Sequence, residues 1–450
     1  MADLAAIFKA YDIRGTFPDQ IDTAASRAIG GAFARFVRLR GSGSVVVGRD
    51  MRPSGADLVE AFTAGVLEHG VDVVDIGLCA TDMMYFASGK LQMPGAVFTA
   101  SHNPAGYNGV KMCLAGAAPV GSDSGLGEIR ALAEAGADPT HERGTRGELD
   151  LLGDYVAHVH SFVDKSRLAP LQVVADTANG MGGLVLPAVF ADLPFELDHL
   201  YPELDGTFPN HPADPIQPEN LRDLKRRVTE LGADIGLAFD GDADRVFLVD
   251  ETARGISGSL TTAVVARAVL EREPGATVIH NLICSKAVPE VVAEAGGTAV
   301  RTRVGHSFIK QVMADTGAAF GGEHSGHYYF RENYRADSGL IAALVVLEAL
   351  SIHDGPLSDL VASVDRYAAS GEINTEVDDP SAAIEAVAHH FTGSPTDRLD
   401  GLTVDLGDWW FNLRPSNTEP LLRLNLEASD AADVECHVDE VLSLFAPRSL

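Results

Sequence analysis

The sequence repeats one local pattern: a short apolar run rich in Val and Ile, then a glycine-containing loop, then a stretch with helical periodicity. Strands that alternate with helices predict α/β layers, because parallel strands need crossover connections, which are usually helices. The runs are apolar at nearly every position, as expected for strands with helices on both faces. The runs lie at 44–50, 71–77, 95–104, 171–180, 233–245, 276–282 and 298–305.

Changes in this pattern indicate the domain organisation. The 450 residues are enough for several domains of about 100–200 residues each. We interpret the polar segment at 136–150 as a first linker, and the pattern changes again near 251–259 and 366–374. The last part resembles a smaller α+β unit, with a hairpin over 400–414, a strand over 421–428 and a helix over 430–445.

The charge balance excludes some classes of partner. Lys and Arg total 34 against 64 Asp and Glu, a formal net charge of −30. Such a surface repels DNA, RNA and anionic lipid, so we expect no nucleic-acid and no membrane partner. Small anionic substrates remain possible, because a few arginines in a cleft can dominate the local field. The chain contains neither a P-loop nor a GxGxxG motif, so a nucleotide role has no support.

The cysteines and the apolar segments indicate the compartment. The four cysteines are far apart and form no CxxC motif, so we expect reduced thiols in the core. The longest apolar stretch, 340–347, is much shorter than the roughly 20 residues that cross a bilayer. The first residues do not resemble a signal peptide. We expect a cytoplasmic protein. The cysteines are Cys79, Cys113, Cys284 and Cys436.

Three aspartates follow the apolar run that ends at residue 239. Asp240, Asp242 and Asp244 alternate with small residues and precede Arg245. Carboxylates at this spacing can converge on one hard cation, and the adjacent arginine favours a site where that cation meets a phosphate. An EF-hand loop is excluded, because Arg245 stands where that loop needs glycine. A solvated acidic turn is the alternative.

A second candidate is the loop that begins after another apolar run, at Ser101, His102, Asn103 and Pro104. Open α/β sheets bind ligands beyond the carboxyl ends of their strands, which is where this serine would lie. A phosphorylated serine would carry about −1.5 to −2 charge and would need a cation. The alternative is a simple turn, since Asn-Pro is a common turn signal.

A third segment combines a carboxylate, a hydroxyl and imidazoles in one loop, at Glu323, Ser325 and His327. These groups suit vicinal sugar hydroxyls. His324 and His327 also form an HxxH pair, so zinc is an alternative interpretation, although no third ligand is evident. A polar loop without function is the other alternative.

A fourth segment suits a phosphate dianion. Arg414 is a possible bidentate donor, and Ser416, Asn417 and Thr418 add hydroxyl and amide groups. An ordinary turn bounded by prolines is the alternative.

Together these segments resemble the α-D-phosphohexomutase superfamily, over essentially the whole chain. The resemblance implies four domains around a central cleft: three α/β/α domains with mixed sheets and a smaller C-terminal α+β domain. The expected domain limits are 1–145 for the domain with the serine loop, 146–252 for the domain with the metal loop, 253–367 for the domain with the sugar loop and 368–450 for the domain with the phosphate loop. The matching motifs are YDIRG (11–15), GRDMRPSG (48–55), TASHNP (99–104), GVKM (109–112), DGDADR (240–245), GHSFIK (305–310), GEHSGH (322–327) and RPSNTEP (414–420).

Carried over by motif, the resemblance implies a role for each candidate. A phosphorylated Ser101 would bind Mg²⁺ together with Asp240, Asp242 and Asp244. Arg245 would steady the transferring phosphoryl group, with Arg14, His102 and Lys111 beside it. Tyr11, His306, Glu323, Ser325 and His327 would bind the sugar, and Arg414, Ser416, Asn417 and Thr418 would hold the phosphate that does not react.

The sugar loop resembles that of the bacterial phosphomannomutase/phosphoglucomutase branch. Phosphoglucosamine mutases are expected to carry Gln in place of His324 and Gly in place of Asn417. One position departs from the pattern: some relatives carry a sugar-contacting lysine where Ile283 stands. Whether Lys286 substitutes for it stays open.

The resemblance implies an isomerase that acts by intramolecular phosphoryl transfer on hexose phosphates of mannose or glucose. A hexose 1,6-bisphosphate would be the intermediate, with Mg²⁺ as cofactor and glucose 1,6-bisphosphate or mannose 1,6-bisphosphate as activator. His102, Glu323 and His327 are candidates for the general base. We expect a monomer or a homodimer. The alternatives are a phosphoglucosamine mutase, a phosphatase or phosphotransferase at the same metal site, and a sugar-phosphate sensor without catalysis.

Overall fold

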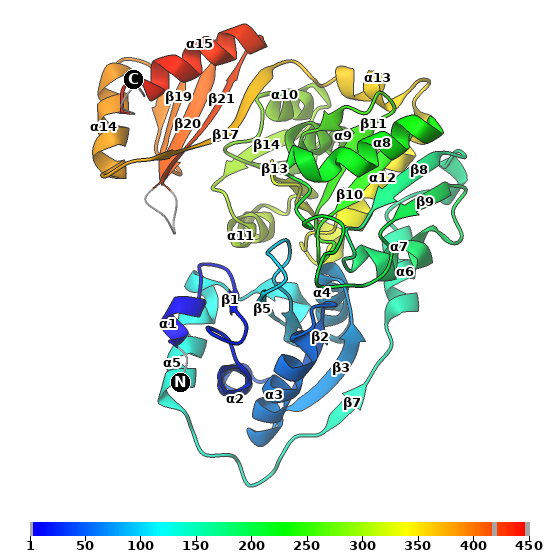
Figure 1. Ribbon diagram of the computed structural model, residues 1–450, viewed down its shortest axis with the longest axis vertical. Coiled ribbons are helices and arrows are strands. Elements are labelled where there is room, and N and C mark those ends of the chain that lie inside the picture. The colour runs from blue at the N-terminus through cyan, green and yellow to red at the C-terminus, as the bar shows by residue number, and fades with distance from the viewer. Residues whose placement is uncertain (1–2, 416–420, 446–450) are drawn as a thin grey trace.

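The computed structural model describes residues 3–415 and 421–445. Four sheets follow one another along the chain, from the bottom of Figure 1 through its right side and centre to the upper left. The first three sheets are mixed and are covered by helices, and the last is antiparallel. The predicted fold class is therefore confirmed.

The first sheet has seven strands in the order β1-β5-β4-β2-β3-β7, with β6 beside β5. β2 is parallel to β3 and β4, whereas β5 is antiparallel to β1 and β4. The loop after β4 contains Ser101. The strands are β1 (Ile13–Thr16), β2 (Ser44–Arg49), β3 (Asp72–Leu78), β4 (Gly95–Phe98), β5 (Tyr107–Leu114), β6 (Ala118–Pro119) and β7 (Arg146–Glu148). The helices are α1 (Leu4–Ile7), α2 (Thr23–Arg38), α3 (Gly55–Glu68), α4 (Thr81–Leu91) and α5 (Gly127–Ala135), with short turns η1 (Ala115–Ala117) and η2 (Ser122–Leu126).

The second sheet has the order β12-β11-β10-β8-β9. Its central strand β10 is parallel to β8 and antiparallel to β11, and the three aspartates lie in the turn between β10 and β11. The strands are β8 (Gln172–Asp176), β9 (Glu196–Leu200), β10 (Ile235–Phe239), β11 (Val246–Asp250) and β12 (Gly255–Ile256). The helices are α6 (Leu152–His160), α7 (Gly182–Phe190) and α8 (Arg222–Leu231), with η3 (Lys165–Arg167) and η4 (Pro218–Leu221).

The third sheet has the order β14-β13-β15-β16, and the sugar loop expected at 322–327 joins its last two strands. The strands are β13 (Thr277–Asn281), β14 (Thr298–Thr302), β15 (Phe320–Gly322) and β16 (Tyr328–Phe330). The helices are α9 (Gly258–Arg272), α10 (Ala287–Glu294), α11 (His306–Thr316), α12 (Gly339–Ile352) and α13 (Leu357–Ala362), with η5 (Arg331–Asn333).

The fourth sheet has the order β17-β21-β20-β19-β18 and is antiparallel throughout. The predicted hairpin is β19 and β20, and the predicted strand and helix are β21 and α15. The strands are β17 (Ala368–Glu376), β18 (Thr396–Asp397), β19 (Leu402–Asp405), β20 (Trp410–Pro415) and β21 (Leu421–Ala428), and the helices are α14 (Pro380–His390) and α15 (Ala431–Leu442).

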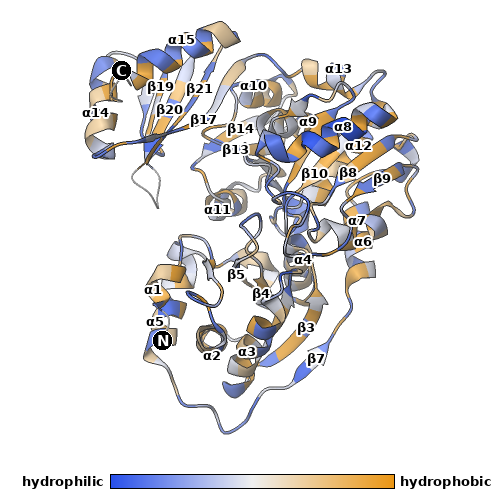
Figure 2. Cartoon of the chain, viewed as in Figure 1, coloured by the Kyte–Doolittle hydropathy of each residue, from blue (hydrophilic) through white to orange (hydrophobic). Residues whose placement is uncertain are grey.

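Local sequence explains where several helices begin. Asp22, Ser257, Ser338 and Asp430 each precede a helix, and each side chain accepts a hydrogen bond from a backbone N–H in the first turn. Such caps satisfy amide groups that have no partner inside the helix. In Figure 2 the central strands β8 and β10 are mostly hydrophobic and α8 is largely hydrophilic, as expected for a sheet beneath an amphipathic helix.

The hydrophobic cores show which parts of the molecule pack together and which part is separate. One large cluster joins α4 of the first sheet to the second and third sheets, while β17–β21, α14 and α15 have a separate core. No helix within 3–415 or 421–445 combines the length and apolarity that a membrane crossing requires.

The expectation of four core cysteines is wrong at one position. Cys79, Cys113 and Cys284 are buried, but Cys436 is exposed. Val434 and Val441 turn one face of α15 toward the core, and Cys436 lies on the opposite face.

Candidate active site

Ser101 lies where the first and second sheets meet. Its hydroxyl donates a hydrogen bond to Asp240 Oδ2 at 2.6 Å and accepts one from Arg245 Nη2 at 3.4 Å. Its backbone adopts φ = +49°, a left-handed conformation that is uncommon for residues other than glycine. The residue is only 5% exposed. A strained, buried serine held against a carboxylate and a guanidinium is typical of a functional position.

Arg52 holds the backbone of this serine loop. Its guanidinium donates to the carbonyl oxygens of Ser101, Asn103, Pro104 and Tyr107 at 2.6–2.9 Å. Arg52 is 1% exposed. Four satisfied carbonyls around one buried cation fix the loop conformation, because each would otherwise be a costly unpaired acceptor. Sequence reasoning assigned no role to Arg52, although the residue lies in one of the matching motifs.

The buried charge of Arg52 has one carboxylate partner. Asp50 Oδ2 lies 3.2 Å from Arg52 Nε, and both side chains are fully buried. Burial raises the pKa of Asp50 to about 6, although the charge of Arg52 opposes the shift.

The three aspartates converge as predicted. Asp240, Asp242 and Asp244 are at most 1% exposed, and their oxygens lie within 4.8 Å of one another. Lys111 from β5 donates to Asp242 Oδ2 at 2.8 Å and to Asp244 Oδ2 at 2.6 Å. The first and second sheets therefore share this charged cluster.

The cluster suits a hard divalent cation. Asp242 Oδ1 and Asp244 Oδ1 are buried, and neither has a hydrogen-bond partner within the described residues. Burial raises the pKa of Asp240 to about 8, against the charge of Arg245. Burial acts in the same direction on Asp242, but the Lys111 ammonium outweighs it and holds the pKa of Asp242 below its usual range. Buried carboxylate oxygens without partners are the ligands that Mg²⁺ prefers.

The remaining groups expected near Ser101 lie close to it. His102 Nδ1 is 3.3 Å from Ser101 Oγ, and Arg14 donates to Asn103 Oδ1 in the same loop. The charge of Arg245 lowers the pKa of His102 well below its usual value, with burial and the charge of Arg14 adding to the shift. The imidazole is therefore neutral beside the serine, but the same positive charges make it a weaker proton acceptor than an ordinary histidine.

The sugar loop presents a fixed carboxylate. Glu323 is 2% exposed and accepts hydrogen bonds from Tyr329 Oη at 2.7 Å, Asn281 Nδ2 at 3.2 Å and the Gly305 amide at 3.2 Å. Neither Tyr329 nor Asn281 was predicted to support it, because no motif marks them.

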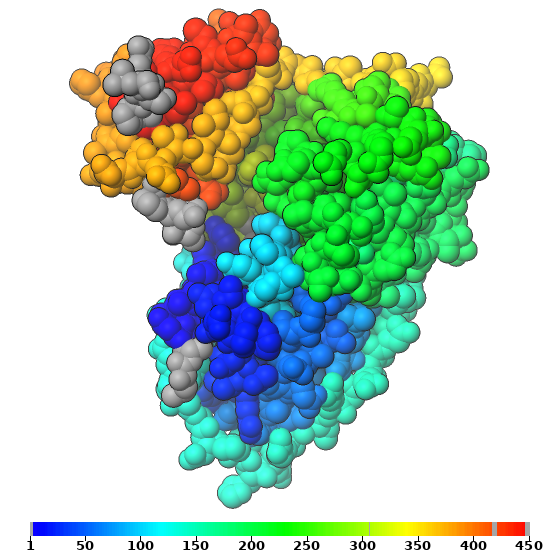
Figure 3. Space-filling view, in the orientation of Figure 1, coloured from blue at the N-terminus to red at the C-terminus, as the bar shows by residue number. Residues whose placement is uncertain are grey.

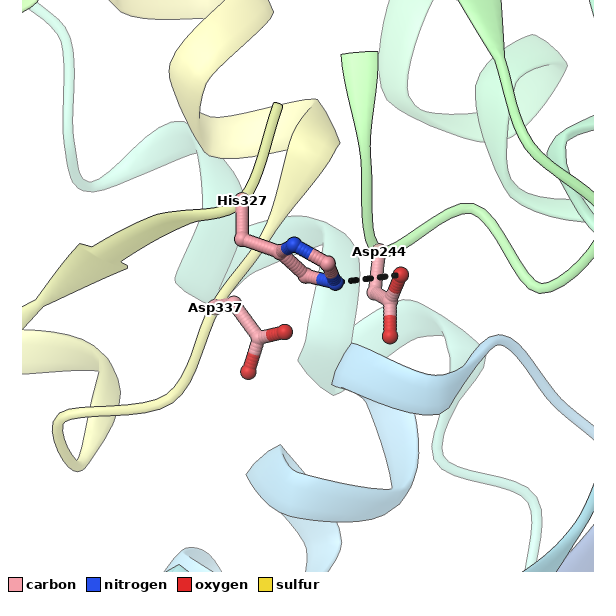
Figure 4. A group of neighbouring side chains, drawn as sticks. All are labelled: Asp244, His327 and Asp337. Atoms are coloured by element: carbon pink, nitrogen blue, oxygen red, sulfur yellow. Dashed lines mark ion pairs between the residues drawn. The ribbon is translucent and has the colours of Figure 1, made fainter. Parts of the chain in front are cut away.

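His327 connects the sugar loop to the metal loop. Its Nδ1 is 2.9 Å from Ser325 Oγ, and its Nε2 is 3.8 Å from Asp244 Oδ1. Figure 4 shows the imidazole pointing toward Asp244, with Asp337 nearby. Asp337 forms a buried ion pair with Lys310 at 2.9 Å.

The zinc interpretation of His324 and His327 finds no support. In the described parts of the chain, the groups of side chains able to hold a metal include His327 but not His324. The Nδ1 atom of His324 instead lies 3.0 Å from the amide Nδ2 of Asn281.

His102, Arg245 and the sugar loop line a cleft of about 1210 Å³, visible as a hollow below the C-terminal part in Figure 3. Tyr11, whose hydroxyl donates to Val304 O at 3.3 Å, also lines it. Every sheet unit contributes to the wall. Its lining includes Tyr11, His102, Arg245, Arg303, Glu323, Ser325, His327, Arg414 and Arg423.

The C-terminal wall of the cleft carries Arg414. It is 8% exposed, and its Nη2 donates to Glu372 Oε2 at 2.8 Å. Ser416, Asn417 and Thr418 lie outside the described residues, and so does the side chain of His306. Arg303, Glu372 and Arg423 line the same cleft and were not predicted.

Lys286 does not replace the missing lysine of the pattern. Its Nζ contacts Asp405 Oδ1 at 2.7 Å and donates to Gly407 O at 3.1 Å. It therefore joins the third and fourth sheet units, whereas Ile283 lines the cleft.

Comparison with known proteins adds a family. Models of the phosphoglucomutase/phosphomannomutase family match α/β/α domain I at residues 5–138, domain II at 153–255, domain III at 257–367 and the C-terminal domain at 372–444. "Phosphohexose mutases" from Xanthomonas campestris pv. campestris is 43% identical, covering 97% of this chain and 98% of the relative.

Two further matches cover the same length. A "Phosphomannomutase" from Salmonella montevideo is 40% identical over 97% of this chain and 98% of the relative. The crystal structure of a phosphoglucomutase/phosphomannomutase family protein from Burkholderia thailandensis has a TM-score of 0.91 and 33% identity, and covers 100% of this chain and 99% of that chain.

Proposed function

The chain belongs to the phosphoglucomutase/phosphomannomutase family, and from this premise we propose that it interconverts mannose 1-phosphate and mannose 6-phosphate, and the glucose pair, through a phosphorylated Ser101. That it is a hexose phosphate mutase follows from the family and its relatives. The phosphomannomutases among the relatives favour mannose. The observation that carries the proposal is the Ser101 hydroxyl held 2.6 Å from Asp240 and 3.4 Å from Arg245.

The chain's own groups account for the transfer. The bond between phosphorus and Ser101 Oγ breaks as a bond from phosphorus to the free sugar hydroxyl forms. Oγ keeps the electron pair of the broken bond and takes up a proton to become the Ser101 hydroxyl. The proton of that hydroxyl passes to a base in the cleft, for which His102, Glu323 and His327 are the candidates. Arg245, Lys111 and Arg14 offset the charge on the phosphoryl oxygens.

The bisphosphate then turns end for end. Its other phosphoryl group returns to Ser101 by the same step in reverse. Glucose 1,6-bisphosphate or mannose 1,6-bisphosphate would restore phosphate to Ser101 after accidental hydrolysis.

We propose that Asp240, Asp242 and Asp244 would hold Mg²⁺ beside a phosphorylated Ser101. When bound, Mg²⁺ supplies positive charge to the phosphoryl oxygens. Asp242 Oδ1 and Asp244 Oδ1 support this assignment, because both are buried and neither has a hydrogen-bond partner among the described residues.

We assign the sugar and the distal phosphate to the other walls of the cleft. Glu323, held by three donors, is preorganised to accept hydrogen bonds from sugar hydroxyls. The sugar group is Tyr11, His306, Glu323, Ser325 and His327, and the phosphate group is Arg414, Ser416, Asn417 and Thr418.

A coupled assay on mannose 1-phosphate, glucose 1-phosphate and glucosamine 1-phosphate tests the function, with Mg²⁺ and trace glucose 1,6-bisphosphate. We expect turnover of both hexoses, weak turnover of the amino sugar and no release of inorganic phosphate. Ser101→Ala should abolish turnover and the phosphoryl mass on the intact protein. Release of phosphate would indicate a phosphatase, and faster turnover of the amino sugar a phosphoglucosamine mutase.

A further inference from the structure

Two arginines lie directly opposite each other on neighbouring strands of the fourth sheet. Arg414 on β20 is the register partner of Arg423 on β21. Like charges in such a pair destabilise an antiparallel ladder. Strand alternation turns both side chains away from the core, where Leu413, Leu422 and Leu424 pack, and toward the cleft. An unfavourable pair on the face that meets a ligand indicates a binding function.

A single carboxylate bridges the two cations. Glu372 on β17 lies 2.8 Å from Arg414 Nη2 through Oε2 and 3.3 Å from Arg423 Nη1 through Oε1. Two guanidinium groups and one carboxylate leave one net positive charge.

The arginines also have donors to spare. Each guanidinium has five N–H donors. The Nε atoms of Arg414 and Arg423 are buried and find no acceptor among the residues described. The pair thus has both surplus charge and surplus donors for an anion.

Both arginines and the sugar loop line one cleft. Its wall includes Arg414 and Arg423 together with His324. Burial lowers the pKa of His324 to about 3, and the positive charges of both arginines add to that shift. Because the two guanidinium groups line the same cleft, Arg423 can act on the same ligand as Arg414.

We propose that Arg423 is a second cation for the phosphate that does not react, and that Glu372 is the internal competitor of that phosphate. The inference rests on the proposed function. A phosphate dianion that enters the cleft takes guanidinium donors that Glu372 otherwise holds, because charge-assisted bidentate bonds to phosphate are strong. The intermediate must leave this site to turn round, and Glu372 takes back the donors at that moment. Glu372 thus limits the affinity of a site that has to release its ligand within each turnover.

The test compares Arg423→Gln and Glu372→Gln by two measurements: KM and kcat for mannose 1-phosphate, and the calorimetric Kd of inorganic phosphate. Arg423→Gln should raise KM at least tenfold and raise Kd. Glu372→Gln should lower both at least threefold and lower kcat, because release becomes slower. Arg423→Lys keeps the charge and should have an intermediate KM.

A matched control removes an arginine from the same domain outside the cleft. Arg398 pairs with Glu385, and its side chain is 49% exposed. Arg398→Gln should change neither KM nor Kd, which excludes a general effect of net charge.

The outcomes separate the parts of the proposal. Unchanged KM and Kd in Arg423→Gln overturn the role of Arg423. A higher KM and Kd in Glu372→Gln mean that Glu372 only orders the arginines, which overturns the competitor role. If Arg423→Gln does not fold, Arg423→Lys and Glu372→Gln decide. If the Kd values shift as expected but the parent protein has no mutase activity, the phosphate site stands and the proposed function is wrong. If the parent is a mutase but the Kd values do not shift, the proposed function stands and this phosphate site is wrong.

Discussion

At Gly241 the backbone of the metal loop packs closely against the serine loop. A Cβ atom at this position would lie 2.4 Å from the Ser101 carbonyl oxygen, a distance that real Cβ atoms do not adopt. Gly241→Ala must therefore push the two loops apart. Because a displacement of about 1 Å in a reacting geometry can cost about 100-fold in rate, we expect kcat to fall by at least that factor.

The control for this substitution is Gly127→Ala in α5. Its Cβ atom would meet nothing within 4 Å. That variant should keep its kcat, and should fold at least as stably as the parent because alanine favours helix. A Gly241→Ala variant with normal kcat would show that the loops tolerate separation.

Arg52 stabilises the serine loop through backbone carbonyl groups. Of the residues to which we assign the reaction, it contacts only Ser101, and there only the backbone. Arg52→Met would leave Asp50 Oδ2 and four carbonyl groups without their guanidinium donors. Removing one partner of a buried ion pair costs about 3–5 kcal/mol, so the free energy of unfolding in urea should fall by about 3 kcal/mol. Phosphate on Ser101 should fall too, as measured by intact mass. The same substitution at exposed Arg398 should leave both quantities almost unchanged.

At the scale of elements, β13 carries a histidine that must stay neutral. His280 is only 5% exposed, and this burial lowers its pKa to about 4. In the unfolded chain His280 takes up a proton near pH 6.5, whereas in the folded chain it does so only near pH 4. His280 therefore contributes stability that is present above pH 6.5 and is lost as the pH falls toward 4.

This loss can be measured as the pH dependence of Tm. The free energy of unfolding should fall by up to about 1.4 kcal/mol for each pH unit because of this one group, and Tm should fall with it. His280→Gln has no proton to gain, so its Tm should fall less steeply between pH 6.5 and 4. Parallel curves for the two proteins would mean that other groups cause the acid sensitivity.

Element identities followed from local patterns. The apolar runs at 44–50, 171–180 and 233–245 became β2, β8 and β10, because a short run of buried apolar residues fits a strand covered on both faces. β5 was not predicted as a strand, although it carries Lys111 and is apolar at most positions. Its antiparallel insertion between β1 and β4 depends on partners far away in the sequence.

At the scale of the whole molecule, Mg²⁺ should stabilise the junction of the first two sheet units. Ser101 belongs to one and the aspartates to the other, so a cation shared by both favours the folded arrangement. Binding at about 100 times Kd adds about 2.7 kcal/mol by mass action. We expect EDTA to lower Tm and abolish turnover, and excess Mg²⁺ to restore both.

Asp242→Asn separates this effect from a general salt effect. The variant loses one ligand charge, so its Tm should respond less to Mg²⁺ than that of the parent. Asp154→Asn, at an exposed ion pair with Lys90, is the matched control and should respond as the parent does. Equal responses of Tm to Mg²⁺ in all three proteins would show that this loop does not bind the metal.

The amino-acid sequence by itself determined the α/β fold class, the family and the chemical content of each loop. These properties depend on residues adjacent in the chain: alternate aspartates after a strand, or a serine before Asn-Pro. The limits of the four domains and the role of each site residue stay predictions.

The resemblance implied that the serine loop, the metal loop and Lys111 meet, but only the tertiary structure decided the contacts that hold them together. Lys111 reaches Asp242 and Asp244, Arg52 holds the serine loop, and Arg423 faces Arg414 across two strands. Lys286 joins two domains instead of facing the cleft, and Cys436 is exposed. Strand register and domain packing set these contacts between residues 9–133 positions apart, and no local pattern of residues encodes such a distance.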